Sequence, residues 1–212
     1  TAFTLYAICE TCDLMNYHDD QMDAHIRKSV EFLKYHIEIG ALNQEIVSIA
    51  AIRYAAKILN DASIRQLSED RFTKFLSGQS GEGWFSEYDG FDISYSTVAL
   101  DYLIRYFELS GDEKALSSAK KILELLKFFI HPDGSLGGEY GSRNTEYFMP
   151  YGIEFLAKES PVAGAMITRL MQYVNQPLYL NISWDERYWL YYISHSFTKA
   201  LIISRNYTSA VG

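Results

Sequence analysis

Two glycine-rich stretches of similar sequence constrain the fold of this chain more than any other feature. The first reads GQSGEGWFSEYDGFDISYS (residues 78–96), and the second reads HPDGSLGGEYGSRNTEYFMP (residues 131–150). A shift of 52 positions places three residues of the second stretch on identical residues of the first: Glu139, Tyr140 and Tyr147 on Glu87, Tyr88 and Tyr95. Long loops inside a compact domain are unusual and tend to carry function. Their recurrence predicts a repeat architecture with its working residues on one face.

The segments around these loops have the apolar spacing of helices, and no alternating strand pattern competes with it. About nine helices are expected, over residues 1–15, 19–37, 43–59, 62–76, 95–109, 113–130, 149–158, 160–174 and 185–205. Short turns near residues 17, 60, 111 and 160 alternate with longer connections near 41, 86, 140 and 180. This alternation predicts an all-α fold of antiparallel helix hairpins, arranged as an incomplete α/α toroid with its long loops at one end.

Length and composition limit the possible classes of protein. The 212 residues are expected to form one domain, and the abrupt helical start at Thr1 suggests the C-terminal part of a longer chain. The net charge of −8 argues against a nucleic-acid partner, which requires a basic face. No apolar run reaches about 18 residues, so no membrane span is expected. No secretory signal is visible in this chain, which leaves the compartment undetermined.

Two short motifs have ordinary structural interpretations. Cys9 and Cys12 form a CxxC pair on an apolar helical segment without a further cysteine, and we expect buried structural thiols. The stretch from Asp19 to Asp23 matches a DDxxD diphosphate-magnesium motif. Its carboxylates are better explained as acidic residues in the first turn of a helix, where they complement the helix dipole.

The stretches GEGWFSEYDGFDISYSTVALDYL (residues 81–103) and HPDGSLGGEYGSRNTEYFMPYGIEFL (residues 131–156) resemble the loop-plus-inner-helix units of α/α-toroid carbohydrate-active proteins. The nearest resemblance is to heparinase II/III-like polysaccharide lyases, and it covers roughly residues 40–160. It implies an acidic, uronate-containing polysaccharide or oligosaccharide as the partner. It also implies β-elimination as the reaction.

Residues of the two stretches suit that chemistry. β-Elimination at a uronic acid requires a neutralised carboxylate, a base for the C5 proton and an acid for the leaving oxygen. Arg143 or Asn144 can hold the carboxylate, since the arginine fork matches its geometry. The base and acid candidates are Tyr140, Tyr147 and Tyr95. His195 is a weaker base candidate, because a histidine on an apolar helix is more often part of the core.

Two further interpretations remain open. Glu87 and Glu139 can instead form the carboxylate pair of a glycoside hydrolase. Alternatively, the loop face binds glycan or protein without turnover. The proposed substrate-binding residues are Trp84, which can stack on a sugar ring or plug the mouth of the toroid, together with Tyr88 and Asp92.

The Glu-Tyr pairs also have a purely structural explanation. In it, each glutamate caps backbone N–H groups at an inner helix start, and each tyrosine packs between repeats. No cofactor is expected. No metal is expected either, because His, Asp and Cys form no cluster with ligand spacing, although a structural Ca²⁺ among loop carboxylates stays open.

Overall fold

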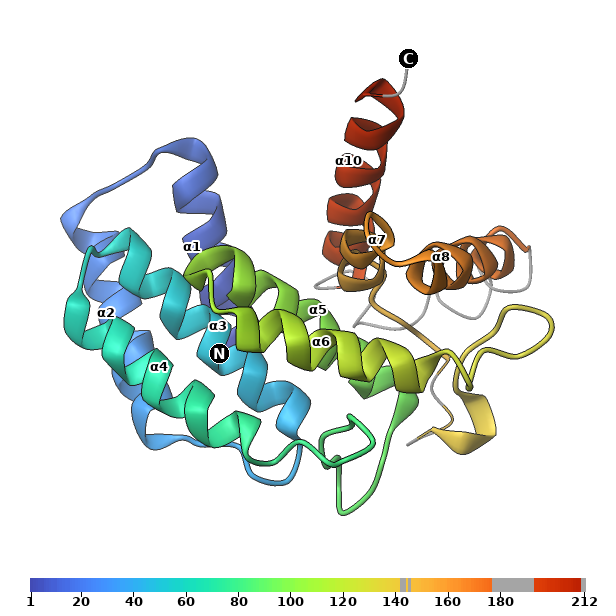
Figure 1. Cartoon of the computed structure of the whole chain (residues 1–212). Coiled ribbons are helices and arrows are strands. Elements are labelled where there is room, and N and C mark those ends of the chain that lie inside the picture. Colours follow the sequence, from blue (N-terminus) through green and yellow to red (C-terminus); the bar gives the residue numbers. More distant parts are fainter. Residues whose placement is uncertain (142–143, 145, 177–192, 211–212) are drawn as a thin grey trace.

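The structure, a computed structural model, describes residues 1–141, 144, 146–176 and 193–210 (Figure 1). In this part of the chain it contains nine α-helices, one short 3-10 helix and no β-strand. The elements are α1 (Ala2–Met15), α2 (Asp20–Tyr35), α3 (Leu42–Ile58), α4 (Ala62–Leu76), α5 (Ile93–Ser110), α6 (Glu113–Leu126), η1 (Gly138–Tyr140), α7 (Tyr151–Ala157), α8 (Pro161–Val174) and α10 (Ser194–Ala210). The all-helical prediction is therefore confirmed.

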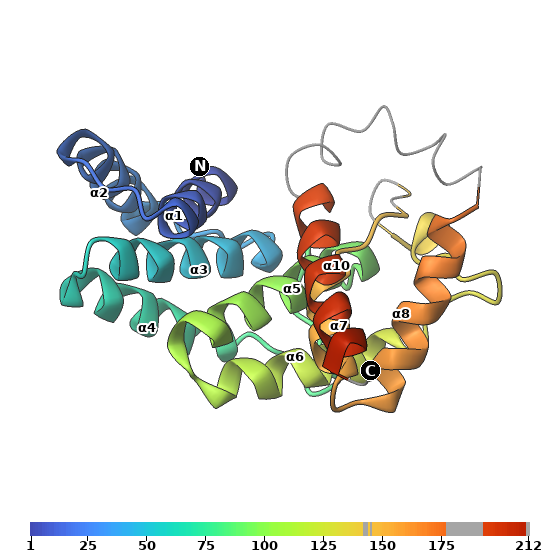
Figure 2. The same ribbon diagram turned by 90° about the horizontal axis from the view of Figure 1, so that it is seen from above.

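The helices pack in a regular order. α3 contacts both α1 and α5, α5 contacts α7, and α7 contacts α10. α4, α6 and α8 each lie against the helix that precedes them in the chain, namely α3, α5 and α7. Figures 1 and 2 show the pairs following one another along the molecule, from α1 and α2 at one end to α7, α8 and α10 at the other.

The core follows from the sequence of the central helices. α3 carries four fully buried alanines, which allow α1, α4 and α5 to approach its backbone closely. Gly152 of α7 has the same effect on α5, since a Cβ at this position would clash with Leu100 Cδ2 and lie 2.9 Å from Asp101 Cα. Small residues thus set the spacing between neighbouring hairpins.

Local caps fix where most helices begin. Side-chain oxygens of Asp19, Asp61, Asp92, Asp112 and Ser160 accept a backbone N–H from the first turn of α2, α4, α5, α6 and α8. Asp19 therefore caps α2, as the helix-start interpretation of the DDxxD stretch predicts.

Some helix boundaries differ from the predicted ones. α5 begins at Ile93 instead of residue 95, because Asp92 is its cap. α6 ends at Leu126 instead of residue 130, because the chain turns after it so that Ile130 can form a bridge with Leu136. The predicted helix 185–205 is described from Ser194 onward, and residues 185–192 of that prediction lie outside the described residues.

None of the helices described is long and apolar enough to cross a membrane.

Candidate functional site

The long loop between α4 and α5 is fastened to the segment that leads into α3. The Leu42 N–H donates to Ser86 O at 3.2 Å, and the Tyr88 N–H donates to Gly40 O at 2.7 Å. Ala41 and Glu87 form an isolated antiparallel bridge. The loop therefore sits at the N-terminal end of α3 and places Glu87 and Tyr88 there.

Glu87 is a buried carboxyl group at this junction. Only 4% of the residue is exposed, and it accepts the Asn43 N–H at 2.6 Å as well as a bond from Asn43 Nδ2. Burial raises the pKa of Glu87 to about 7; the Asn43 bonds lower it, while Asp92 and Glu38 raise it further. Glu87 thus caps the start of α3, which is the structural role considered for the Glu-Tyr pairs.

Three tyrosines form a continuous row beside this junction, called here the tyrosine row. The ring centroids of Tyr88 and Tyr95 are 6.1 Å apart, and those of Tyr95 and Tyr147 are also 6.1 Å apart. Tyr88 is 52% exposed, Tyr95 is half-buried and Tyr147 is 9% exposed. The row joins the two glycine-rich stretches, residues 78–96 and 131–150, and leads from the surface into the protein.

Asp92 positions the middle ring of the row. Its Oδ1 accepts the Tyr95 N–H at 2.7 Å, and the residue is 2% exposed. Trp84 belongs to a different aromatic group, with its ring 6.3 Å from that of Phe91 and its Nε1 donating to Glu82 at 3.0 Å. Asp92 therefore acts on the tyrosine row through the backbone, whereas Trp84 contacts Phe91 and Glu82 elsewhere on the loop.

The second stretch does not repeat the geometry of the first. Glu139 and Tyr140 lie on η1 and are exposed, and the Tyr140 ring lies edge-on to His131 at 5.6 Å. Gly137 and Gly138 precede them with φ of 90° and 71°, which turns the chain outward. Glu139 is thus placed differently from the buried Glu87, although the two align in sequence.

The remaining candidates of this stretch are only partly described. Asn144 is exposed and has a φ of 53°. Arg143, the proposed carboxylate-binding residue, lies outside the described residues. Its place relative to the tyrosine row is therefore still a prediction.

A buried group of charged residues, called here the polar centre, was not predicted from the sequence. Arg105 and Asp101 of α5 form an ion pair with 0% side-chain exposure. Asp101 Oδ2 also accepts the Ser196 hydroxyl of α10 at 2.5 Å, and Ser196 Oγ accepts the Tyr151 N–H of α7 at 3.1 Å. The i,i+4 spacing of the ion pair is visible in the sequence, but the contacts with α7 and α10 are not.

Aromatic rings and a second ion pair complete the polar centre. The Arg105 guanidinium carbon lies 5.3, 4.9 and 5.2 Å from the ring centroids of Tyr6, Tyr102 and Tyr151. Glu10 of α1 pairs with Lys199 of α10 at 2.9 Å. Burial raises the pKa of Glu10, but the bonds from His195 and Lys199 outweigh it and bring the value to about 2.

His195 is held on both ring nitrogens. Nδ1 lies 3.2 Å from Arg105 Nη1, and because a guanidinium only donates, Nδ1 is the acceptor. Nε2 lies 2.7 Å from Glu10 Oε2 and donates to it. With neither nitrogen free, this geometry favours the core role of His195 over that of a general base.

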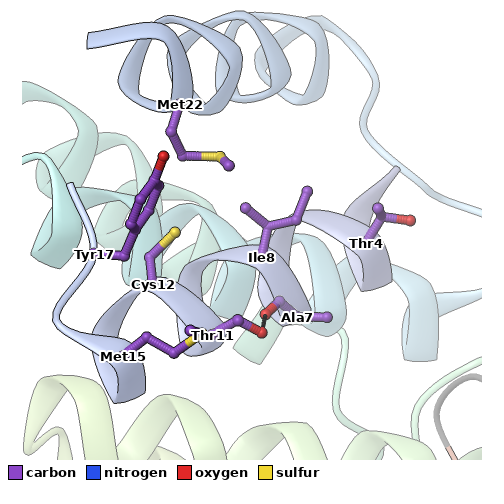
Figure 3. Close-up of a pocket in the computed structure, with 8 residues that line it drawn as sticks. All are labelled: Thr4, Ala7, Ile8, Thr11, Cys12, Met15, Tyr17 and Met22. Carbon is purple, nitrogen blue, oxygen red and sulfur yellow. Dashed lines mark hydrogen bonds between the residues drawn. The ribbon is translucent and has the colours of Figure 1, made fainter. Parts of the chain in front are cut away.

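A separate apolar pocket of about 280 Å³ lies between α1 and α2 (Figure 3). It is lined by residues such as Ile8, Cys12, Met15 and Met22. Cys9 and Cys12 are both free and buried, as predicted. Nothing in the pocket resembles the chemistry expected from the loops.

Among the residues that the structure describes, no group of three or more His, Cys, Asp or Glu side chains is arranged to hold a metal ion. No protein-family model, curated protein or solved structure matches this chain.

Proposed function

We propose that this chain is a carbohydrate-active protein that binds an acidic, uronate-containing polysaccharide at the loop end, with the tyrosine row as its binding platform. The observation that carries the proposal is the row itself. Tyr88 and the half-buried Tyr95 offer apolar ring faces to a sugar, and the buried Tyr147 continues the row into the protein.

The proposal includes an incomplete α/α toroid as the arrangement of the helices. The order of contacts from α1 through α3, α5 and α7 to α10 supports it. The ion pair between Glu10 and Lys199 supports it as well, since it joins the first of these helices to the last. In this arrangement the tyrosine row lies at the ends of the inner helices, beside the long loops.

The favoured reaction is β-elimination. In this scheme Tyr147 or Tyr95 takes the C5 proton of the uronate, the electron pair forms the C4–C5 double bond, and the C4–O bond breaks. A second phenol, with Tyr140 as the further candidate, protonates the leaving oxygen. Arg143 and Asn144 bind the carboxylate and stabilise the charge that develops on it.

A glycoside hydrolase that uses Glu87 and Glu139 is the second candidate. A pKa of about 7 suits a general acid at neutral pH, which favours Glu87. However, Glu87 is buried and bonds to both the backbone and the side chain of Asn43, so a substrate would have to displace these contacts. β-Elimination is therefore placed first.

The test is calorimetric titration with oligogalacturonate and with a neutral oligosaccharide of equal length. We expect saturable binding of the uronide, and a loss of about tenfold in Tyr88→Ala, because stacking on one ring contributes about 1–2 kcal/mol. The control is Tyr17→Ala, which removes an exposed tyrosine from the turn after α1.

Product analysis separates the reactions. An unsaturated uronide product would support β-elimination, a saturated product would support hydrolysis, and binding without any product would support a non-catalytic binding protein. The proposal is wrong if the protein binds no saccharide, or if Tyr88→Ala and Tyr17→Ala bind the uronide as tightly as the unchanged protein.

A further inference from the structure

A second pocket, which shares no residue with the tyrosine row, lies where the loop after α4 meets α6. Its volume is about 370 Å³. α6 contributes Glu113, Lys114, Ser117, Ser118 and Lys121 to its lining, and Gln79 forms part of the opposite wall. The spacing of 114, 117, 118 and 121 places these four residues on one face of the helix.

The polar groups of this pocket favour an anion. Neither Lys114 nor Lys121 forms an ion pair with any described residue, and Glu113 is the only carboxylate in the lining. The lining therefore carries a net positive charge on a protein whose net charge is −8.

Ser118 carries a buried hydroxyl group in the wall of this pocket. The residue is 2% exposed, and its Oγ has no hydrogen-bond partner in the described part of the chain. Leaving a buried hydroxyl unpaired is unfavourable, so we expect it to be satisfied by a group other than the described residues. An oxyanion in the pocket would accept its proton and pair with the two ammonium groups.

The wall opposite α6 is held in place. Gln79 Nε2 donates to Gly83 O at 2.8 Å and to Ser118 O at 3.1 Å. Gly83 packs so closely on α6 that a Cβ there would lie 2.7 Å from Lys121 O. The loop is thus fixed against the helix.

The second repeat has the same contact but lacks the pocket's chemistry. Gly134 packs on α8 as Gly83 packs on α6, with a Cβ position 2.6 Å from Arg169 O. This contact aligns Lys121 with Arg169, a shift of 48 that also aligns the helix caps Asp112 and Ser160.

With this alignment, the residues of α8 that correspond to the polar residues of α6 can be read directly. They are Val162 for Lys114, Ala165 for Ser117 and Met166 for Ser118. Met166 is 5% exposed, and Arg169 Nη2 donates to Pro132 O at 2.9 Å. In α8, apolar residues therefore allow the same contact between loop and helix. The lysines and serines of α6 are not required for that contact.

We infer that this pocket binds a small oxyanion, a sulfate or phosphate group that is either free or esterified to a sugar. Lys114 and Lys121 supply the charge, and the Ser118 hydroxyl donates a hydrogen bond. The inference does not depend on the function proposed for the tyrosine row.

The experiment measures binding of inorganic sulfate, inorganic phosphate and a hexose 6-sulfate by calorimetry at constant ionic strength. We expect the Lys114→Met/Lys121→Met variant to lose about tenfold or more in affinity, because it removes two charge-assisted contacts. The matched control, Lys120→Met/Lys127→Met, removes the same charge from the same region outside the pocket and should bind as the unchanged protein does.

Ser118→Met places the residue of the second repeat in the pocket. We expect it to lose binding while its melting temperature stays the same or rises, because it removes an unpaired hydroxyl. Tighter binding of the hexose sulfate would identify an ester as the ligand, and equal binding would identify the free anion.

The inference is overturned if the unchanged protein binds none of the three anions. It is also overturned if the pocket variant and its control lose affinity equally, since that would be a general effect of charge. Because both lysines are exposed, the double variant tests the site even if Ser118→Met does not fold.

Discussion

The polar centre and the tyrosine row are both built from tyrosines, but the first places them around a buried charge and the second leads them toward solvent. In the polar centre, three rings surround the fully buried Arg105, and charged or hydroxyl groups from α1, α5 and α10 pair with one another, while α7 donates a backbone N–H. In the tyrosine row, the rings follow one another toward solvent, and Tyr88 remains 52% exposed. One arrangement joins helices, whereas the other leaves aromatic surface available.

The difference follows from the cost of burying charge. Removing two charges from water costs more free energy than their attraction returns, unless further hydrogen bonds compensate. Each charged group in the polar centre therefore needs several contacts. An exposed ring has no such requirement, because water satisfies its hydroxyl group. We therefore expect changes in the polar centre to affect folding and changes in the tyrosine row to affect binding.

The largest expected effect is that of Asp101→Ala. It leaves the Arg105 guanidinium buried without its carboxylate, and we expect a loss of about 3–5 kcal/mol in the free energy of unfolding. Urea titration followed by circular dichroism measures it. Asp70→Ala removes an exposed carboxylate that bonds to Gln66 and should cost less than about 0.5 kcal/mol. Equal losses in the two variants would contradict the role of the polar centre.

Glu87, which lies beside the tyrosine row at the start of α3, makes stability depend on pH. Its pKa is about 7 in the folded protein against an ordinary value of 4.5, so the folded state binds the proton more tightly. The stability from this group is present below pH 4.5 and is lost as pH rises through about 7, by at most about 3 kcal/mol.

The difference in unfolding free energy between the unchanged protein and Glu87→Gln isolates this effect, because the other titrating groups cancel. As the pH rises from about 4.5 to about 7.5, the unchanged protein should lose stability relative to Glu87→Gln. Glu139→Gln, at the exposed equivalent position, is the control for removal of a carboxylate. A difference that does not vary with pH would disprove the assignment.

Gly152→Ala tests the contact between α7 and α5 beside the polar centre. The added Cβ would meet Leu100 and the backbone of Asp101, and we expect a loss of about 1–3 kcal/mol. Gly164→Ala in α8 is the control, because a Cβ there meets nothing within 4 Å, and it should raise stability by up to about 1 kcal/mol. Thermal melts of both variants should therefore shift in opposite directions.

The smallest effect on folding is expected for Tyr88→Ala. The side chain is half exposed, so its removal should change the unfolding free energy by less than about 0.5 kcal/mol. A loss above about 2 kcal/mol would show that the outer ring of the tyrosine row is part of the core, and the comparison of the two regions would then fail.

Local signals in the sequence predicted much of the fold. Asp61 and Asp112 cap helices that begin within a residue of the predicted positions, because a cap acts on its own first turn. The structural role considered for the Glu-Tyr pairs applies to Glu87. It does not extend to Glu139, because two glycines with positive φ turn the second stretch outward.

Local signals in the sequence could not predict the polar centre. Asp101 and Arg105 stand one turn apart on a predicted helix, but their further partner Ser196 is 95 residues from Asp101 in the chain. Periodicity reports which face of a helix is buried and not which helix covers it. The same limit applies to the pocket on α6, whose polar face resembles an ordinary solvated one until the loop is placed against it.

The contact between Glu10 and Lys199 spans 189 positions, and this has a consequence for how the protein is made. Neighbouring helix pairs can assemble while the chain is still being synthesised, since their contacts are local. The carboxylate of Glu10 must wait for the synthesis of 189 further residues before Lys199 exists. α1 and α10 therefore depend on each other, and α1 acquires these surroundings only when translation has reached α10.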